Sequence, residues 1–254
     1  MYSTGVTPAL NSSAPFEGPQ SFATTHWSVV LAAGQIDSPH AAAALERLCR
    51  AYWYPLYAYV RRRGSGPEDA QDWTQSFFAR LLGRDLLSRA SPERGRFRSF
   101  LLTALQNFLA DEHDRTTARK RGGGQPLISL DASDGEARYA LEPSHEVSPD
   151  KLFERRWATT VLEQAWERLG AEYAADGKAD LFRELRRFNS AQENAPSYPE
   201  VAERLGLPEN TVKSLVHRMR GRYHALLRAE IGHTVADPAE IDEEIRFLLR
   251  VLEG

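Results

Sequence analysis

The sequence has a single cysteine and no long apolar run, and each shortage excludes a class of protein. Cys49 can form no disulfide within the chain, and its place on an apolar helical face predicts a buried, inert thiol. No apolar stretch approaches the length that crosses a bilayer, and the N-terminus lacks the basic-then-apolar pattern of a secretory signal. We therefore expect a cytoplasmic protein without membrane insertion.

The residue patterns of enzymes and metal sites are also missing. No glycine-rich phosphate loop follows a strand pattern, and Gly122–Gly124 end a predicted helix rather than begin one. Asp111–Asp114 occupy consecutive helical positions that mostly point in different directions, which disfavours a shared metal ion. The histidines are scattered without metal-ligand spacing, at His26, His40, His113, His145, His217, His224 and His233. These patterns predict a protein that is not an enzyme and needs no cofactor.

Charge is spread unevenly along a chain whose formal net charge is only −3. Arginine and lysine clearly outnumber acidic residues between Arg50 and Arg121. The compensating acid lies in 122–149 and 232–254. A basic segment inside a nearly neutral protein indicates a polyanion-binding domain.

Residues 197–222 have the pattern of a helix-turn-helix. Val201, Ala202 and Leu205 give the first helix a short apolar face, with a small residue where two helices approach closely. Gly206 falls where the turn needs a residue that tolerates positive φ. Helical spacing then resumes at Val212, Leu215, Val216 and Met219.

The opposite face of this second helix is polar and basic. Its side chains can reach phosphates and base edges if the helix enters a major groove. We predict DNA contact by Asn210, Thr211, Lys213, Ser214, His217, Arg218 and Arg220. A helical hairpin with a solvated basic face is the alternative.

The periodicity elsewhere predicts an all-α protein of two helical domains joined by a flexible acidic linker. We expect a disordered segment at 1–21, a first domain at 22–121 and the linker at 122–149. A second domain at 150–231 is expected to pack under the helix-turn-helix, and 232–254 forms an acidic amphipathic tail. Pro55 interrupts a long apolar period, which predicts a kink or two abutting helices.

A helix predicted at 67–82 has two unlike faces. Its start carries proline and acidic residues, which favour a helix N-terminus. Its inner face is aromatic and aliphatic, whereas its outer face is acidic and polar. The outer face is small enough in its middle to admit a partner helix, and it carries Asp69, Asp72, Gln75, Ser76 and Ala79.

Taken together, these segments resemble a bacterial RNA polymerase sigma factor of the sigma-70 family, extracytoplasmic-function (ECF) type. The resemblance rests on 54–63 (YPLYAYVRRR), 67–78 (PEDAQDWTQSFF), 97–107 (FRSFLLTALQN) and the helix-turn-helix. It implies a protein that binds core RNA polymerase, through its β′ coiled-coil and its β subunit, and directs it to promoter DNA. Asp69, Asp72, Gln75 and Ser76 would bind the coiled-coil, and the linker would thread the RNA exit path.

The resemblance also assigns the two DNA elements. The second domain would read the minus-thirty-five element as duplex, and the segment 91–121 would melt and read the minus-ten element. Phe97 or Phe100 would be available to stack on an unpaired base. The minus-ten candidates are Arg96, Phe97, Arg98, Ser99, Phe100, Asn107, His113, Arg115, Arg119 and Lys120.

The sequence departs from the family pattern in several places. Gln71 stands where glutamate is frequent, Phe100 where tryptophan is frequent, and Pro208 replaces the usual serine-type helix cap. The segment 22–34 and the tail beyond residue 231 are additions that resemble a subgroup found beside Ser/Thr protein kinases. That association motivates the hypothesis that Thr74 is phosphorylated, with a Ser/Thr kinase or an anti-sigma factor as a further partner.

Two other functions compete with this interpretation. A helix-turn-helix regulator that acts without polymerase would bind duplex DNA tightly by itself, but it leaves the acidic helix face unexplained. A helical scaffold or anti-sigma protein would not need the outward lysine, histidine and arginine of the second helix. Because acidic and basic surfaces coexist in one chain, a compact free form with the two domains packed face to face stays open. Whether the tail blocks the DNA-binding surface in the free protein stays open too.

Overall fold

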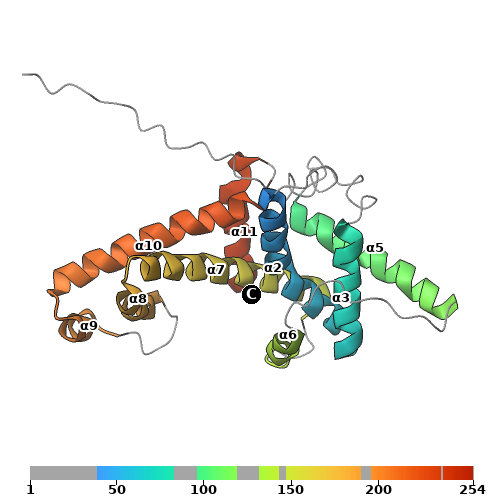
Figure 1. Ribbon diagram of the computed structural model, residues 1–254, viewed down its shortest axis with the longest axis horizontal. Helices are drawn as coiled ribbons and strands as arrows, with labels where there is room; N and C mark the ends of the chain where they lie inside the picture. The colour runs from blue at the N-terminus through green and yellow to red at the C-terminus, as the bar shows by residue number, and fades with distance from the viewer. Residues whose placement is uncertain are drawn as a thin grey trace, which may run out of the picture.

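The computed structural model describes residues 39–82, 96–118, 132–142, 147–189, 196–235 and 237–253. Within these ranges the regular structure is helical throughout, without a strand (Figure 1). The all-α prediction is therefore confirmed. The predictions for 1–21, the segment 22–34, Arg119 and Lys120 fall outside the described residues.

The first half of the chain is built from α2 (Pro39–Arg62), α3 (Pro67–Leu82) and α5 (Phe97–Ala118). Aromatic side chains join the three helices. Tyr52 of α2 meets Phe97 of α5 edge to face at 5.5 Å between ring centroids, and Phe77 of α3 lies 5.7 Å from Phe108 of α5. Gly64, at φ 101°, lies in the short turn that separates α2 from α3.

Pro55 does not divide its helix into two. α2 is one element from Pro39 to Arg62 with Pro55 inside it. Of the two expected outcomes, the pair of abutting helices is wrong, and the kink stays a prediction. A proline costs a helix one backbone hydrogen bond, and tertiary packing can outweigh that cost. The residues on both sides of Pro55, Tyr54 and Leu56, are buried.

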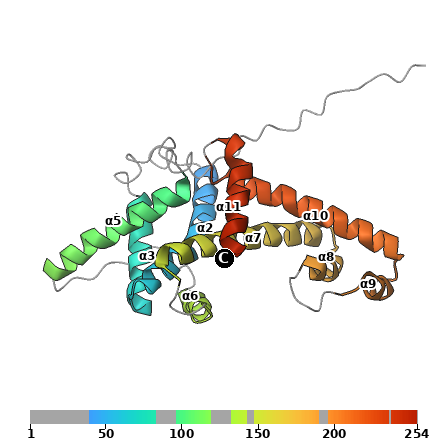
Figure 2. The ribbon, with the colours of Figure 1, turned by 180° about the vertical axis from the view of Figure 1, so that it is seen from behind.

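The second half contains α7 (Pro149–Ala175), α8 (Ala179–Arg186), the 3₁₀ turn η2 (Arg187–Asn189), α9 (Tyr198–Leu205) and α10 (Glu209–Gly232). α7 begins at a capped end, where the Ser148 hydroxyl accepts a hydrogen bond from the Lys151 N–H at 3.3 Å. α7 and α10 lie side by side (Figures 1 and 2).

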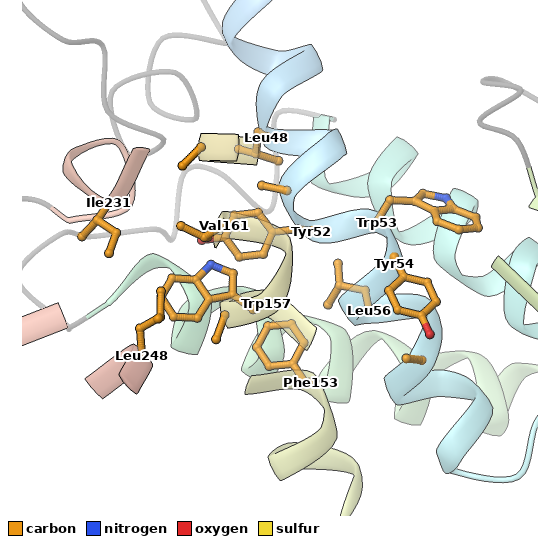
Figure 3. Close-up of a cluster of buried hydrophobic side chains, with 14 of the residues drawn as sticks. Leu48, Tyr52, Trp53, Tyr54, Leu56, Phe153, Trp157, Val161, Ile231 and Leu248 are labelled. Atoms are coloured by element: carbon orange, nitrogen blue, oxygen red, sulfur yellow. The ribbon is translucent and has the colours of Figure 1, made fainter. Parts of the chain in front are cut away.

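α7 serves both halves of the chain. Its N-terminal part places Phe153 and Trp157 against Tyr52 and the aliphatic side chains of α2 (Figure 3). Its C-terminal part packs on α10, where Trp166 stacks on Tyr223 at 4.1 Å. One apolar cluster therefore runs from α2 through α7 to α10. This packing is compatible with two domains. The sequence led us to expect that α7 belongs to the helix-turn-helix half alone, whereas it packs on both halves.

The predicted flexible linker contains a helix, α6 (Ala132–Tyr139), that docks on α2. The Arg61 guanidinium holds Glu136 of α6 through two hydrogen bonds of 2.9 and 2.7 Å, and the Tyr57 hydroxyl donates a third of 2.6 Å. Gly135 lies so close to Trp53 that an added Cβ would come within 2.9 Å of the indole ring. The prediction of an unstructured linker is wrong for this part of 122–149.

The acidic tail forms a 3₁₀ turn, η3 (Pro238–Glu240), and the helix α11 (Ile241–Glu253). α11 packs against α7 and α10, with Leu248 fully buried. In Figures 1 and 2, α11 stands where the two halves of the molecule meet, beside α2. Among the described helices, none combines the length and the apolar character needed to cross a bilayer.

Candidate nucleic-acid interface

The helix-turn-helix is set by local hydrogen bonds. Ser197 and Glu200 form a reciprocal capping box at the start of α9: the Ser197 N–H donates to Glu200 at 2.9 Å, and the Glu200 N–H donates to the Ser197 hydroxyl at 3.4 Å. Gly206 ends α9 at φ 62°, ψ 32°, and the Leu207 N–H donates to the Ala202 carbonyl at 3.0 Å. Pro208 then stands at the N-cap of α10 without a side-chain cap.

The N-terminal part of α10 presents the predicted DNA-facing side chains together. Val212, Val216 and Met219 are buried on the side of α10 that packs against its neighbours α7 and α9, which turns the opposite face outward. Thr211 is half-buried. The other predicted residues are exposed: Asn210, Lys213, Ser214, His217, Arg218 and Arg220.

These side chains differ in the hydrogen bonds and ion pairs that they form within the protein. Lys213 forms an ion pair with Glu209 at 2.6 Å. Arg220 donates to Asn189 at 3.1 Å and to the Phe188 carbonyl at 2.9 Å, so it ties α10 to η2. Within the described part of the chain, His217 and Arg218 have no hydrogen-bond or ion-pair partner. Arg218 is therefore the cation of this face that is best placed to bind a ligand.

α3 carries a second exposed polar face. Ala70, Phe77, Phe78 and Leu81 are buried, which leaves Asp69, Asp72 and Ser76 exposed and Gln75 half-buried. The spacing of three and four residues places the exposed side chains in one stripe. In the ranges that the structure covers, neither Asp69 nor Asp72 has an ion-pair partner.

The predicted minus-ten residues on α5 do not form one open face. Ser99, Asn107 and His113 are exposed and Phe100 is half-buried, whereas Phe97 is completely buried against Tyr52. Stacking of Phe97 on a base is therefore ruled out in this conformation. The backbone of Arg115 lies in α5, but its side chain falls outside the description.

Arg96 and Arg98, at the start of α5, are occupied by the tail. Arg96 contacts Glu240 at 2.8 Å, Glu243 at 3.0 Å and Glu244 at 3.3 Å. Arg98 pairs with Glu244, and its guanidinium lies 3.9 Å from the ring centroid of Phe247. Burial lowers the pKa of Arg98 to about 10, so its guanidinium stays charged at neutral pH. The expectation that both arginines face DNA does not hold for this conformation.

A model of the ECF sigma factor family matches residues 42–229, which is most of the chain from α2 to the end of α10. The chain belongs to the ECF sigma factor family. ECF sigma factors bind core RNA polymerase and direct it to specific promoters, and this protein has that regulatory function in transcription initiation. Comparison with curated proteins and with solved structures gave no match.

Thr74 of this sigma factor is not accessible to a kinase in this conformation. Its side chain is completely buried, and its hydroxyl donates to the Ala70 carbonyl at 2.7 Å. A kinase cannot reach a hydroxyl on the inner face of α3, between the buried Ala70 and Phe77. Phosphorylation of Thr74 would therefore require α3 to leave its packed position.

The sequence does not predict that two linker carboxylates, those of Glu136 and Glu142, fasten the linker to α2 and α7. Besides Glu136, Glu142 accepts a hydrogen bond from the Tyr54 hydroxyl at 2.5 Å and pairs with Arg156 of α7. The hydrogen bonds from Arg61 lower the pKa of Glu136. Glu136 and Glu142 thus bind the sigma factor's own arginines.

Acidification is expected to detach α6. Because the pKa of Glu136 is lowered in the folded state, its stabilisation is complete above the ordinary glutamate value of about 4.3 and is lost as the pH falls through the lower folded value. Acrylamide quenching of tryptophan fluorescence should rise over that range as Trp53, which is only 7% exposed, becomes accessible.

Glu136→Gln should show the raised quenching already at pH 7 and a flatter pH profile. Trp53→Phe identifies the part of the signal that comes from Trp53. If the wild-type and Glu136→Gln profiles coincide, Glu136 does not hold α6 in place.

Proposed function

We propose that this sigma factor binds the β′ coiled-coil of core RNA polymerase through the stripe of Asp69, Asp72, Gln75 and Ser76 on α3. The observation that carries the proposal is that Asp69 and Asp72 are exposed and have no ion-pair partner among the described residues. Two unpaired carboxylates beside small polar side chains suit a helical partner that presents basic residues. A DNA-binding regulator that acts alone would not need such a face. An anti-sigma factor that blocks polymerase would have to cover it.

The exposed face of α10 is proposed to read the minus-thirty-five element as duplex. Its N-terminal turns carry Asn210, Lys213, His217 and Arg218 outward, and the buried contacts with α9 fix the direction of that face. A recognition helix in a major groove uses side chains from its first turns in this way. Minus-ten recognition is assigned to Ser99, Phe100, Asn107 and His113, together with Arg96 and Arg98 once these are free.

Gel filtration with purified bacterial core RNA polymerase tests the polymerase assignment. We expect the protein to co-elute with core and to support initiation from a template bearing its own upstream region. Salt-sensitive binding of duplex DNA without any association with core would instead favour a regulator that acts without polymerase.

Arg218→Ala is expected to weaken binding of the minus-thirty-five duplex by about 1–3 kcal/mol, roughly tenfold to a hundredfold, if the guanidinium contacts a base. Its folded stability should not change, because Arg218 is exposed and has no described partner. Fluorescence anisotropy with labelled promoter duplex, beside thermal unfolding, measures both quantities.

Arg220→Ala is the matched comparison on the same helix. Because Arg220 bonds to Asn189 and Phe188, its loss should lower the unfolding temperature as well as the affinity. Equal affinity of wild type and Arg218→Ala for the duplex would exclude Arg218 from the interface.

A further inference from the structure

We propose that α11 imitates nucleic-acid phosphate and holds Arg96 and Arg98 closed until DNA displaces it. Arg96 contacts three carboxylates of the tail, and one of these, Glu244, also pairs with Arg98. A planar guanidinium recognises carboxylate and phosphate by the same bidentate geometry. The inference rests on the proposed function of α5, because it assumes that this surface meets the minus-ten strand.

Stability alone does not explain the arrangement. Arg98 is 8% exposed and Glu244 is 1% exposed, so the pair lies almost entirely out of water. Taking two charges out of water costs about as much as their attraction returns, and an apolar pair of similar volume would serve a purely structural helix as well or better. What the Arg98–Glu244 pair provides instead is specificity, because the buried carboxylate of α11 requires a cationic side chain opposite it on α5.

α11 is attached in a way that allows release. Glu244 and Leu248 are its fully buried residues, and Leu249 is half exposed to solvent. Its other apolar side chains, such as Phe247, are only partly buried against the core. The region that matches the ECF family ends at residue 229, before α11 begins. We therefore expect the helices shared with the family to stay folded when α11 lifts from α7 and α10.

Displacement follows from competition. A protein whose binding-competent form is only partly populated binds its ligand more weakly by that fraction. Free sigma factor should then bind single strands weakly. Promoter DNA held close by polymerase has a high effective concentration and can replace the carboxylates of α11. The tail thus restrains minus-ten contacts outside the polymerase complex.

The test is the affinity of the full-length protein for a fluorescein-labelled, single-stranded dT15 oligonucleotide, measured by anisotropy. Glu243→Gln/Glu244→Gln removes two of the carboxylates that contact Arg96 and the one that holds Arg98. We expect it to bind at least about fivefold more tightly than wild type. Glu167→Gln/Glu253→Gln is the matched control: it removes the same charge from two exposed glutamates without a described partner, and it should bind within twofold of wild type.

Adding Arg96→Ala to the released variant should abolish most of the gain. A gain that persists without Arg96, an equal gain in the control, or no gain at all would overturn the inference. Circular dichroism and thermal unfolding establish that each variant is folded. Hydrogen exchange needs no variant: saturating dT15 should speed exchange in 241–253 of wild type, and unchanged or slower exchange there would also overturn the inference.

The two proposals, polymerase binding and shielding by α11, fail in experimentally different ways. If neither wild type nor any variant co-elutes with core polymerase, the polymerase assignment falls. The dT15 affinities still decide whether α11 shields Arg96 and Arg98. If the proteins co-elute with core but the released variant gains nothing, the proposed function stands and the shielding by α11 is wrong.

Discussion

Asp72→Arg is expected to abolish co-elution of the sigma factor with core RNA polymerase. Asp72 is exposed in the middle of the polar stripe of α3, with Asp69 one turn before it and Ser76 one turn after it. An arginine there would face a basic partner, and like charges opposed in an interface cost several kcal/mol, which corresponds to a loss of affinity of more than about a hundredfold. Gel filtration and anisotropy with labelled core measure the loss.

Asp180→Arg is the matched control for this charge reversal. Asp180 lies on α8, its side chain is 90% exposed, and its one described ion pair is with the neighbouring Arg183. The control should bind core like wild type, and Asp72→Arg should still bind the minus-thirty-five duplex through α10. Loss of both activities in Asp72→Arg would indicate misfolding. Retention of core binding would exclude the α3 stripe from the polymerase interface.

Trp157→Ala is expected to destabilise the whole molecule by about 3–5 kcal/mol. Trp157 is completely buried where α7 crosses α2, and its ring lies 6.4 Å from that of Phe247 on α11 and 5.0 Å from the Arg98 guanidinium (Figure 3). Alanine would leave a cavity in contact with three helices. For a chain of this size, the unfolding temperature should fall by about 6–20 °C, as measured by circular dichroism or calorimetry.

Trp166→Ala, nine residues further along α7, distinguishes this effect from the loss of any tryptophan. Trp166 is half-buried and stacks on Tyr223 of α10, so its removal should cost less. Hydrogen exchange in α2 should accelerate in Trp157→Ala and remain near wild type in Trp166→Ala. Unchanged exchange in α2 for both variants would show that α7 does not couple the two halves.

The elements that the sequence predicts well are those that local residues determine. The helix-turn-helix depends on Ser197, Glu200 and Gly206, all of which act within one turn of their position, and α9 and α10 form as the pattern indicates. The polar stripe of α3 can also be predicted from the sequence, because the spacing of Ala70, Phe77 and Leu81 alone identifies the inner face.

What the sequence does not reveal depends on partners far along the chain. Arg96 and Arg98 read as free cations, because the glutamates that neutralise them lie nearly 150 residues away, at a separation of 146 for Arg98 and Glu244. Glu136 likewise reads as linker charge until Arg61 is placed beside it, 75 residues earlier in the chain. Phe97 and Thr74 belong to the same group, since only the packed neighbours show that neither side chain reaches the surface.

The separation in sequence between Arg98 and Glu244 also determines how long the ribosome takes to make the second residue after the first. A ribosome adds about 5–20 residues each second, so the 146 residues that separate the two side chains take about 7–30 s to make. For most of that interval α2, α3 and α5 have been synthesised, but the carboxylates of α11 do not yet exist. Every newly made molecule therefore passes through a stage in which the arginines at the start of α5 are uncovered and open to any polyanion nearby.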